Sequence, residues 1–178
     1  MSDNDVIVWS KNHSLIWSDF KSESNPALFE DAHSVIKYEF TWTVNSEKIE
    51  NDIFFLIEHI QLSADFHCNL SWVRSSQVNA NLLKHEQGHF DLAELLKREN
   101  IKKIQQIFYG RKFPTRGQNE EQRKQYAKED SGKMIIKEVE KLEQLLSKRR
   151  KEYDEQTNFG QNLSEQLKYD SQFHDLKS

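Results

Sequence analysis

The sequence is poor in residues that cross-link or interrupt a chain. It contains one cysteine, Cys68, with two prolines and five glycines among 178 residues. A single cysteine cannot form an intramolecular disulfide, which excludes a small extracellular scaffold held together by disulfides. We expect Cys68 to be a small buried hydrophobic residue. Neither proline falls between Leu82 and Leu96, so nothing in that stretch interrupts a helix.

Long apolar runs are also missing. Hydrophobic residues make up 36% of the chain and charged residues 30%. No run of about 20 apolar residues occurs, so we expect no membrane span. Residues 1–5 are acidic and lead directly into residues 6–9 without the basic and apolar parts of a secretory leader. We therefore predict a cytoplasmic protein without membrane contact, secreted only if a leader has been removed.

Basic side chains concentrate in the middle of the chain. Between residues 97 and 152 they outnumber acidic ones, although the whole chain carries a net charge of −4. These lysines and arginines are interspersed with glutamates, and no nucleic-acid-binding motif accompanies them. We therefore predict no nucleic-acid partner.

The most specific pattern is the run from His85 to His89, which matches the H-E-x-x-H motif of zinc hydrolases. On a helix the two histidines lie one turn apart and can share a cation about 2 Å from each. Glu86 between them can take a proton from a zinc-bound water, whose pKa falls to about 7. The motif predicts one Zn²⁺ held by His85 and His89, with Glu86 as the general base of a peptidase. Imidazole also suits nickel, copper and iron, so the identity of the metal stays open.

The surroundings of the motif are helical. Apolar residues recur at helical spacing at Leu82, Leu83, Phe90, Ala93, Leu95 and Leu96. Gly88 costs a helix about 1 kcal/mol relative to alanine, which fits a close approach by another element or a substrate. The ordinary alternative is an amphipathic core helix whose histidines only form hydrogen bonds.

The N-terminal part has strand character. Residues 6–20 and 33–62 are rich in β-branched and aromatic side chains, with Tyr38, Phe40, Trp42 and Val44 on one parity. We predict strands in both stretches, with a break at residues 22–26. Residues 47–52 are predicted to be a polar turn or the start of a strand that begins at Ile53. Residues 64–73 are predicted to form a further strand or a loop.

Two long helices are predicted after the strands. The first begins after Asn79 as N-cap and ends near Tyr109, and the second begins near Asn119. Between them lie three turn-forming residues, Gly110, Pro114 and Gly117. The second helix carries an apolar seam at steps of four, three and four residues, which predicts core packing: Ile135, Val139, Leu142 and Leu146.

Four blocks of the sequence resemble a known family. They are residues 17–20 (WSDF), 71–73 (SWV), 82–91 (LLKHEQGHFD) and 153–160 (YDEQTNFG). In this order they resemble a family of uncharacterised proteins described as secreted zinc-dependent proteases, whose shared motif is H-E-Q-x-H-F-D. The resemblance implies a zinc peptidase that acts on a peptide or protein substrate.

The chain departs from this family at one important position. The family's terminal block has a histidine that is the natural candidate for a third zinc ligand, and this chain has Phe159 there. A catalytic zinc normally has three protein ligands, so another donor must substitute or the site is incomplete. Asp154, Glu155 and His174 are the alternatives, and Phe159 is expected to be a core residue. If Phe159 lies within reach of the histidines, Phe159→His should tighten zinc binding.

Two other zinc-peptidase patterns can be compared with the chain. The metzincin extension needs glycine and histidine where this chain has Leu92 and Leu95, so it is excluded. A third ligand could instead be a glutamate of the second long helix. Three are available, Glu138, Glu140 and Glu143, although such acids commonly belong to a solvated helix face.

We predict a single α+β domain over residues 1–178. Residues 1–75 should form a mostly antiparallel sheet, residues 79–150 two long helices including a zincin-like active-site helix, and residues 151–178 a C-terminal segment. The predicted function is a zinc metallopeptidase. The alternative is a catalytically degenerate relative that has lost its third ligand at Phe159 and binds a partner. The sequence leaves substrate preference and oligomeric state open.

Overall fold

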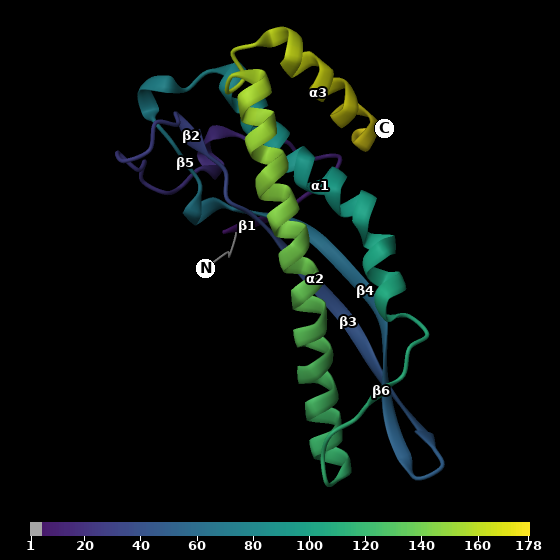
Figure 1. Cartoon of the computed structure of the whole chain (residues 1–178). Helices are drawn as coiled ribbons and strands as arrows, with labels where there is room; N and C mark the ends of the chain where they lie inside the picture. The colour runs from purple at the N-terminus through teal and green to yellow at the C-terminus, as the bar shows by residue number, and fades with distance from the viewer. Residues whose placement is uncertain (1–4) are drawn as a thin grey trace.

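The structure is a computed structural model that describes residues 5–178 (Figure 1). Residues 1–4, which contribute to the prediction that the chain has no leader, lie outside the described part. None of the described helices combines the length and the apolar character that a membrane crossing requires.

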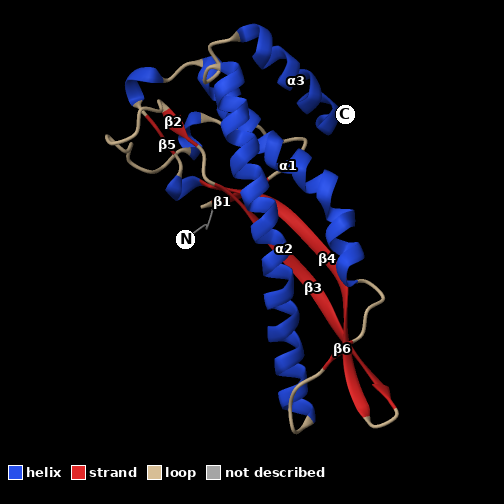
Figure 2. Cartoon of the chain, in the orientation of Figure 1, coloured by secondary structure: helices blue, strands red, loops and turns tan. Residues whose placement is uncertain are grey.

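The fold class is α+β, as predicted, with antiparallel strands and three α-helices in the described residues (Figure 2). The strands are β1 (Val6–Val8), β2 (Ala32–His33), β3 (Ile36–Ile49), β4 (Asp52–His67), β5 (Trp72–Val73) and β6 (Phe113–Pro114). The helices are α1 (Ala80–Phe108), α2 (Glu120–Thr157) and α3 (Leu163–Lys177). Three short 3₁₀ helices cover Trp17–Asp19, Cys68–Leu70 and Ser75–Gln77.

A long hairpin of β3 and β4 dominates the sheet. The strand order is β1-β4-β3, with β6 also paired to β4, while β2 and β5 form a separate antiparallel pair. As predicted, Tyr38 is buried, and Phe40, Trp42 and Val44 on the same parity are partly covered. The apolar face of the hairpin therefore packs against the helices.

Two strand predictions were wrong in detail. Within residues 6–20 only β1 is a strand, because the chain beyond it is tied to side chains of α1 rather than continuing along β4. The amide of Leu15, for example, donates to the Gln87 side chain at 2.8 Å. The turn predicted at residues 47–52 is narrower, because β3 continues to Ile49 and only Glu50 and Asn51 reverse the chain.

Both predicted helix starts are confirmed. The side chain of Asn79 accepts from the amide of Leu82 at 2.9 Å, and that of Asn119 accepts from Gln122 at 2.9 Å. The seam along α2 is buried, which confirms core packing: Ile135, Val139, Leu142 and Leu146. The predicted end of the second helix, at residue 150, was too early, because α2 continues to Thr157.

Helix α1 is central to the arrangement, because it contacts β4, α2, α3 and β2. Residues 85–94 are buried without a gap, since the sheet side, α2 and α3 surround this part of the helix. In Figure 1, α2 crosses in front of α1 and α3 folds back beside them. The motif is therefore enclosed where the three helices and β2 come together.

Candidate metal centre

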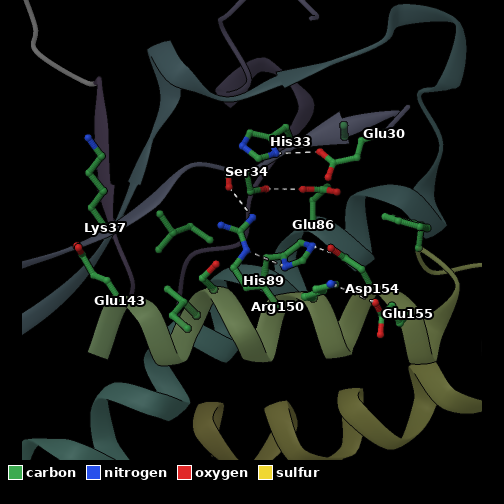
Figure 3. Close-up of a pocket in the computed structure, with 16 residues that line it drawn as sticks. Glu30, His33, Ser34, Lys37, Glu86, His89, Glu143, Arg150, Asp154 and Glu155 are labelled. Atoms are coloured by element: carbon green, nitrogen blue, oxygen red, sulfur yellow. Dashed lines mark hydrogen bonds and ion pairs between the residues drawn. The ribbon is translucent and has the colours of Figure 1, made fainter. Parts of the chain in front are cut away.

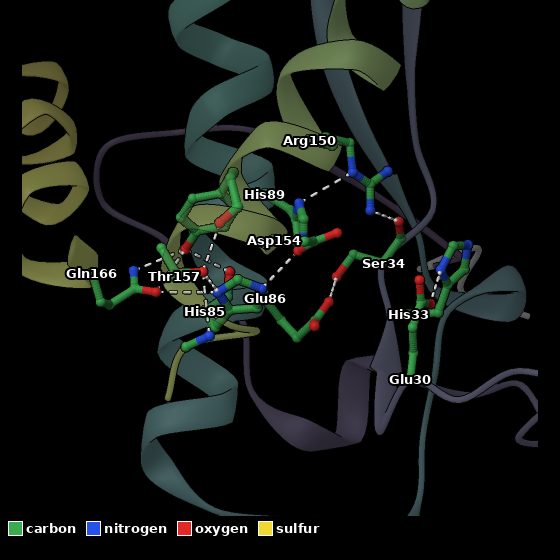
Figure 4. Close-up of polar contacts among 12 residues, drawn as sticks. Glu30, His33, Ser34, His85, Glu86, His89, Arg150, Asp154, Thr157 and Gln166 are labelled. Carbon is green, nitrogen blue, oxygen red and sulfur yellow. Dashed lines mark hydrogen bonds and ion pairs between the residues drawn. The ribbon is translucent and has the colours of Figure 1, made fainter. Parts of the chain in front are cut away.

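Two histidines of α1 and one aspartate of α2 converge. The Oδ1 atom of Asp154 lies 2.9 Å from Nε2 of His85 and 2.9 Å from Nε2 of His89 (Figure 4). One ligand atom from each of the three residues lies within 4.8 Å of the other two, and both imidazoles are buried. The helical spacing of the histidines predicted their shared face, and the packing of α2 on α1 adds the carboxylate.

Asp154 is thus the one of the three alternative donors that joins the pair. Glu155, the next residue on α2, lies 3.9 Å from Lys151, and its side chain is 66% exposed. His174 is exposed on α3 and belongs to no such group in the described residues.

The prediction that Phe159 is a core residue was wrong. Its side chain is 47% exposed and lines the same cleft as Asp154. Asn158, Phe159 and Gly160 all have positive φ angles, so the chain reverses sharply after α2 and turns Phe159 outward.

The three glutamates considered as ligands lie on α2, as Asp154 does, but too far along the helix axis from the histidine pair. Glu138 binds Lys141 at 2.7 Å, and Glu140 is exposed. Glu143 precedes Asp154 by three helical turns, or roughly 16 Å along the axis. None of the three reaches the histidine pair.

The second ring nitrogen of His85 faces hydrogen-bond acceptors. Nδ1 lies 3.1 Å from the amide oxygen of Gln166 and 3.4 Å from the hydroxyl of Thr157. That hydroxyl donates its own hydrogen to the carbonyl of Tyr153 at 2.7 Å, so it acts as an acceptor toward His85. Nδ1 therefore carries a hydrogen, and Nε2, which faces the Asp154 carboxylate, donates a second one there; a metal ion bound at Nε2 would replace that second hydrogen.

Close packing fixes the orientation of the same ring. Tyr153 stacks on His85 with ring centroids 4.5 Å apart, and its hydroxyl donates to the His85 carbonyl at 3.1 Å. A Cβ at Gly88 would lie 2.0 Å from the Tyr153 hydroxyl, and one at Gly160 would lie 2.9 Å from Cβ of His85. Both glycines are needed for this approach, as the expectation of a close contact at Gly88 anticipated.

His89 has a different kind of neighbour. Nε of Arg150 donates to its Nδ1 at 3.2 Å, and arginine has no acceptor, so the direction of this bond is fixed. The hydrogen of a neutral His89 then lies on Nε2 and points at Asp154. Burial and the nearby Arg150 charge hold the pKa of His89 below its ordinary value.

The Asp154 carboxyl is held in its charged form. Burial acts to raise its pKa, but hydrogen bonds from His85 and His89 outweigh burial, and the pKa lies well below the ordinary value. A carboxylate is the form that can bind a cation.

Glu86 faces a cleft of about 550 Å³ that also exposes His89, Asp154 and Arg150 (Figure 3). The hydroxyl of Ser34 donates to its Oε2 at 2.5 Å, and the Ser34 carbonyl accepts from Nη2 of Arg150 at 2.6 Å. Ser34 and Arg150 therefore connect the acid of the motif to its second histidine.

The remaining polar residues of the H-E-Q-x-H-F-D block are structural anchors. The Asp91 carboxylate accepts from the Trp9 indole and from the Gln87 amide, each at 2.9 Å. Gln87 in turn binds the backbone of Leu15. These contacts hold the N-terminal segment against α1, away from the histidine pair.

Several residues of the centre escaped the sequence analysis. Tyr153 and Thr157 were within the terminal block of the resemblance, and their spacing of four residues, continued by Gly160, could have indicated one face of a helix against His85. Ser34, Arg150 and Gln166 stand in no motif, so only the tertiary structure brings them to the site.

Comparison of the chain with protein-family models, curated proteins and solved structures finds no match. The family resemblance therefore stays a prediction, and function has to be argued from the site itself.

Proposed function

We propose that this protein is a zinc-dependent metallopeptidase in which His85, His89 and Asp154 hold one Zn²⁺ and Glu86 is the general base. On this proposal α1 is a zincin-like active-site helix. The supporting observation is the convergence of two Nε2 atoms and a carboxylate oxygen beside a cleft that also exposes Glu86.

The donor set suits the metal. Two imidazole nitrogens and one carboxylate oxygen match the three-ligand sets of catalytic zinc sites, which keep a fourth position for water or substrate. The acceptors at Nδ1 of His85 are the outer partners that a zinc-bound histidine usually has. His85 and Asp154 are thus already arranged for a metal, whereas His89 would have to release Arg150.

Glu86 is placed to move protons during hydrolysis. When bound, zinc lowers the pKa of water to about 7 and polarises a carbonyl group. Ser34 occupies Oε2 of Glu86, so Oε1 is the oxygen that takes a proton from the attacking water and passes it to the leaving amine.

The opposite side of the cleft offers a hydrogen-bond acceptor for the substrate. Nδ1 of His33 lies 2.9 Å from Glu30, and both residues line the cleft. Nδ1 of His33 donates to the Glu30 carboxylate, which leaves the Nε2 lone pair of a neutral His33 to accept a hydrogen bond from a backbone N–H of a peptide or protein substrate.

One observation favours a second function, binding of a partner without catalysis. The hydrogen bond from Arg150 uses the Nδ1 lone pair of His89, an arrangement that needs no metal. In that case Arg150, His89 and Asp154 form a partly buried polar network that only shapes the cleft.

Glu86→Gln tests the peptidase proposal. The variant keeps the size of the side chain but loses the base, so hydrolysis of a mixed peptide library should be abolished while zinc content is unchanged. Glu99→Gln, an exposed change on the same helix, is the control and should retain wild-type turnover. Turnover retained in Glu86→Gln would contradict the mechanism.

A further inference from the structure

Arg150 stands between the general base and the second histidine of the motif. It is half-buried on α2, and its guanidinium donates in two directions, from Nε to His89 and from Nη2 to the Ser34 carbonyl. Figure 4 shows both bonds leaving the Arg150 side chain, one toward His89 and one toward Ser34. Two bonds from a planar group fix its position more firmly than one bond would.

The two histidines are therefore not equivalent. His85 donates from Nδ1 to Gln166, and it can keep this bond when a metal replaces the hydrogen on its Nε2. His89 accepts at Nδ1, so a neutral His89 carries its hydrogen on Nε2 and has no lone pair there. Binding of a metal by Nε2 of His89 moves the ring hydrogen to Nδ1, where it would face the N–H of Arg150. Two donors cannot share one hydrogen bond.

We infer that Arg150 is a latch on the metal centre, which must leave Nδ1 of His89 before that histidine can ligate zinc. This inference rests on the proposed zinc site but concerns a residue outside the ligand set. Arg150 is a positioning residue, since it acts through His89. Its release also frees a guanidinium that already lines the substrate cleft.

The latch has a measurable effect on metal affinity. A hydrogen bond to a charged donor that zinc must break opposes binding, and its removal should tighten zinc binding roughly tenfold to a hundredfold. Arg150→Met removes the donors and keeps an apolar stem of similar reach. Zinc affinity is measured by competition with a chelator, which requires no substrate and no turnover.

Loss of a positive charge alone could also tighten zinc binding, so the control must remove a charge nearby. Lys151→Met does this, since Lys151 lines the same cleft and its side chain is 79% exposed. We expect its zinc affinity to stay within about threefold of wild type, because exposed charges are strongly screened. Arg150→Lys, which lacks the planar fork, should fall between Arg150→Met and wild type.

Nitrogen-15 NMR of histidine-labelled protein tests the premise without a variant. In the metal-free wild type, Nδ1 of His89 is expected to lack a hydrogen and Nδ1 of His85 to carry one, and zinc should place a hydrogen on Nδ1 of His89. A metal-free His89 with its hydrogen on Nδ1 would overturn the latch. So would zinc binding of equal strength in wild type and Arg150→Met. Failure of both wild type and Arg150→Met to bind zinc contradicts the proposed function as well. Tighter binding in Arg150→Met, with no such gain in Lys151→Met, supports the latch.

Discussion

The two halves of α1 are built differently. From residue 85 to residue 94 the helix is buried on every side, and this half contains six buried polar or charged side chains: His85, Glu86, Gln87, His89, Asp91 and Glu94. Between residues 97 and 107 only Ile104 is buried, and most polar side chains reach solvent. One half is an ordinary amphipathic helix that covers the sheet, whereas the other is a polar core.

The difference shows that the energetically costly burial of polar side chains is concentrated in the first half of α1. A buried polar group destabilises a protein unless it is hydrogen-bonded. In the first half, partners come from distant segments, such as Ser34 for Glu86 and Gln166 for His85. A concentration of costly, long-range polar contacts beside a cleft is characteristic of functional sites. Experiments on the two halves should therefore give different results.

The largest difference is expected for alanine substitutions. Gly88→Ala introduces a Cβ 2.0 Å from the Tyr153 hydroxyl, so Tyr153 must move off His85. We expect a loss of about 3 kcal/mol in the free energy of unfolding. The matched change in the other half, exposed Gln106→Ala, should stay within about 0.5 kcal/mol. Urea denaturation of both variants measures this, and equal stability would mean that Tyr153 does not pack as described.

The carboxylate from α2 should dominate metal affinity. Asp154→Asn replaces a charged ligand by a weakly donating amide, so zinc affinity should fall by more than about a hundredfold. Glu155→Gln is the control, because Glu155 lines the same cleft and lies outside the donor group. Calorimetric titration distinguishes the two, and a similar affinity for both variants would argue against Asp154 as a ligand.

An outer partner should have a smaller effect. Gln166→Leu removes an acceptor from Nδ1 of His85, and zinc affinity should fall about tenfold because the imidazole becomes less well oriented. Gln172→Leu, an exposed change on α3, should leave the affinity unchanged. Comparable losses in both variants would indicate a general effect on α3 packing instead.

The smallest change is expected at Phe159. With Asp154 as the third donor, Phe159→His should alter zinc affinity by less than about tenfold, even though residue 159 lines the cleft. A gain beyond a hundredfold in the same titration would show that a histidine at this position, rather than Asp154, completes the site.

The sequence predicted the elements better than the way they meet. Both asparagine caps, the apolar seam of α2 and the shared face of the histidines follow from local spacing, which acts within a few residues. Asp154 could be named only as one of several donors, because its approach to His89 depends on where α2 crosses α1. Arg150 and Ser34 had no local pattern, and residues beyond β1 were taken for a strand because their α1 partners are more than 70 residues away.

The central claim is that the buried half of α1 holds a metal ion. Its most direct test is metal content by mass spectrometry on tag-free protein purified without chelators, beside the His85→Ala/His89→Ala double variant. The account predicts about one zinc ion per chain in the wild type and none in the variant. A wild type that remains metal-free after incubation with zinc and removal of the excess would contradict it.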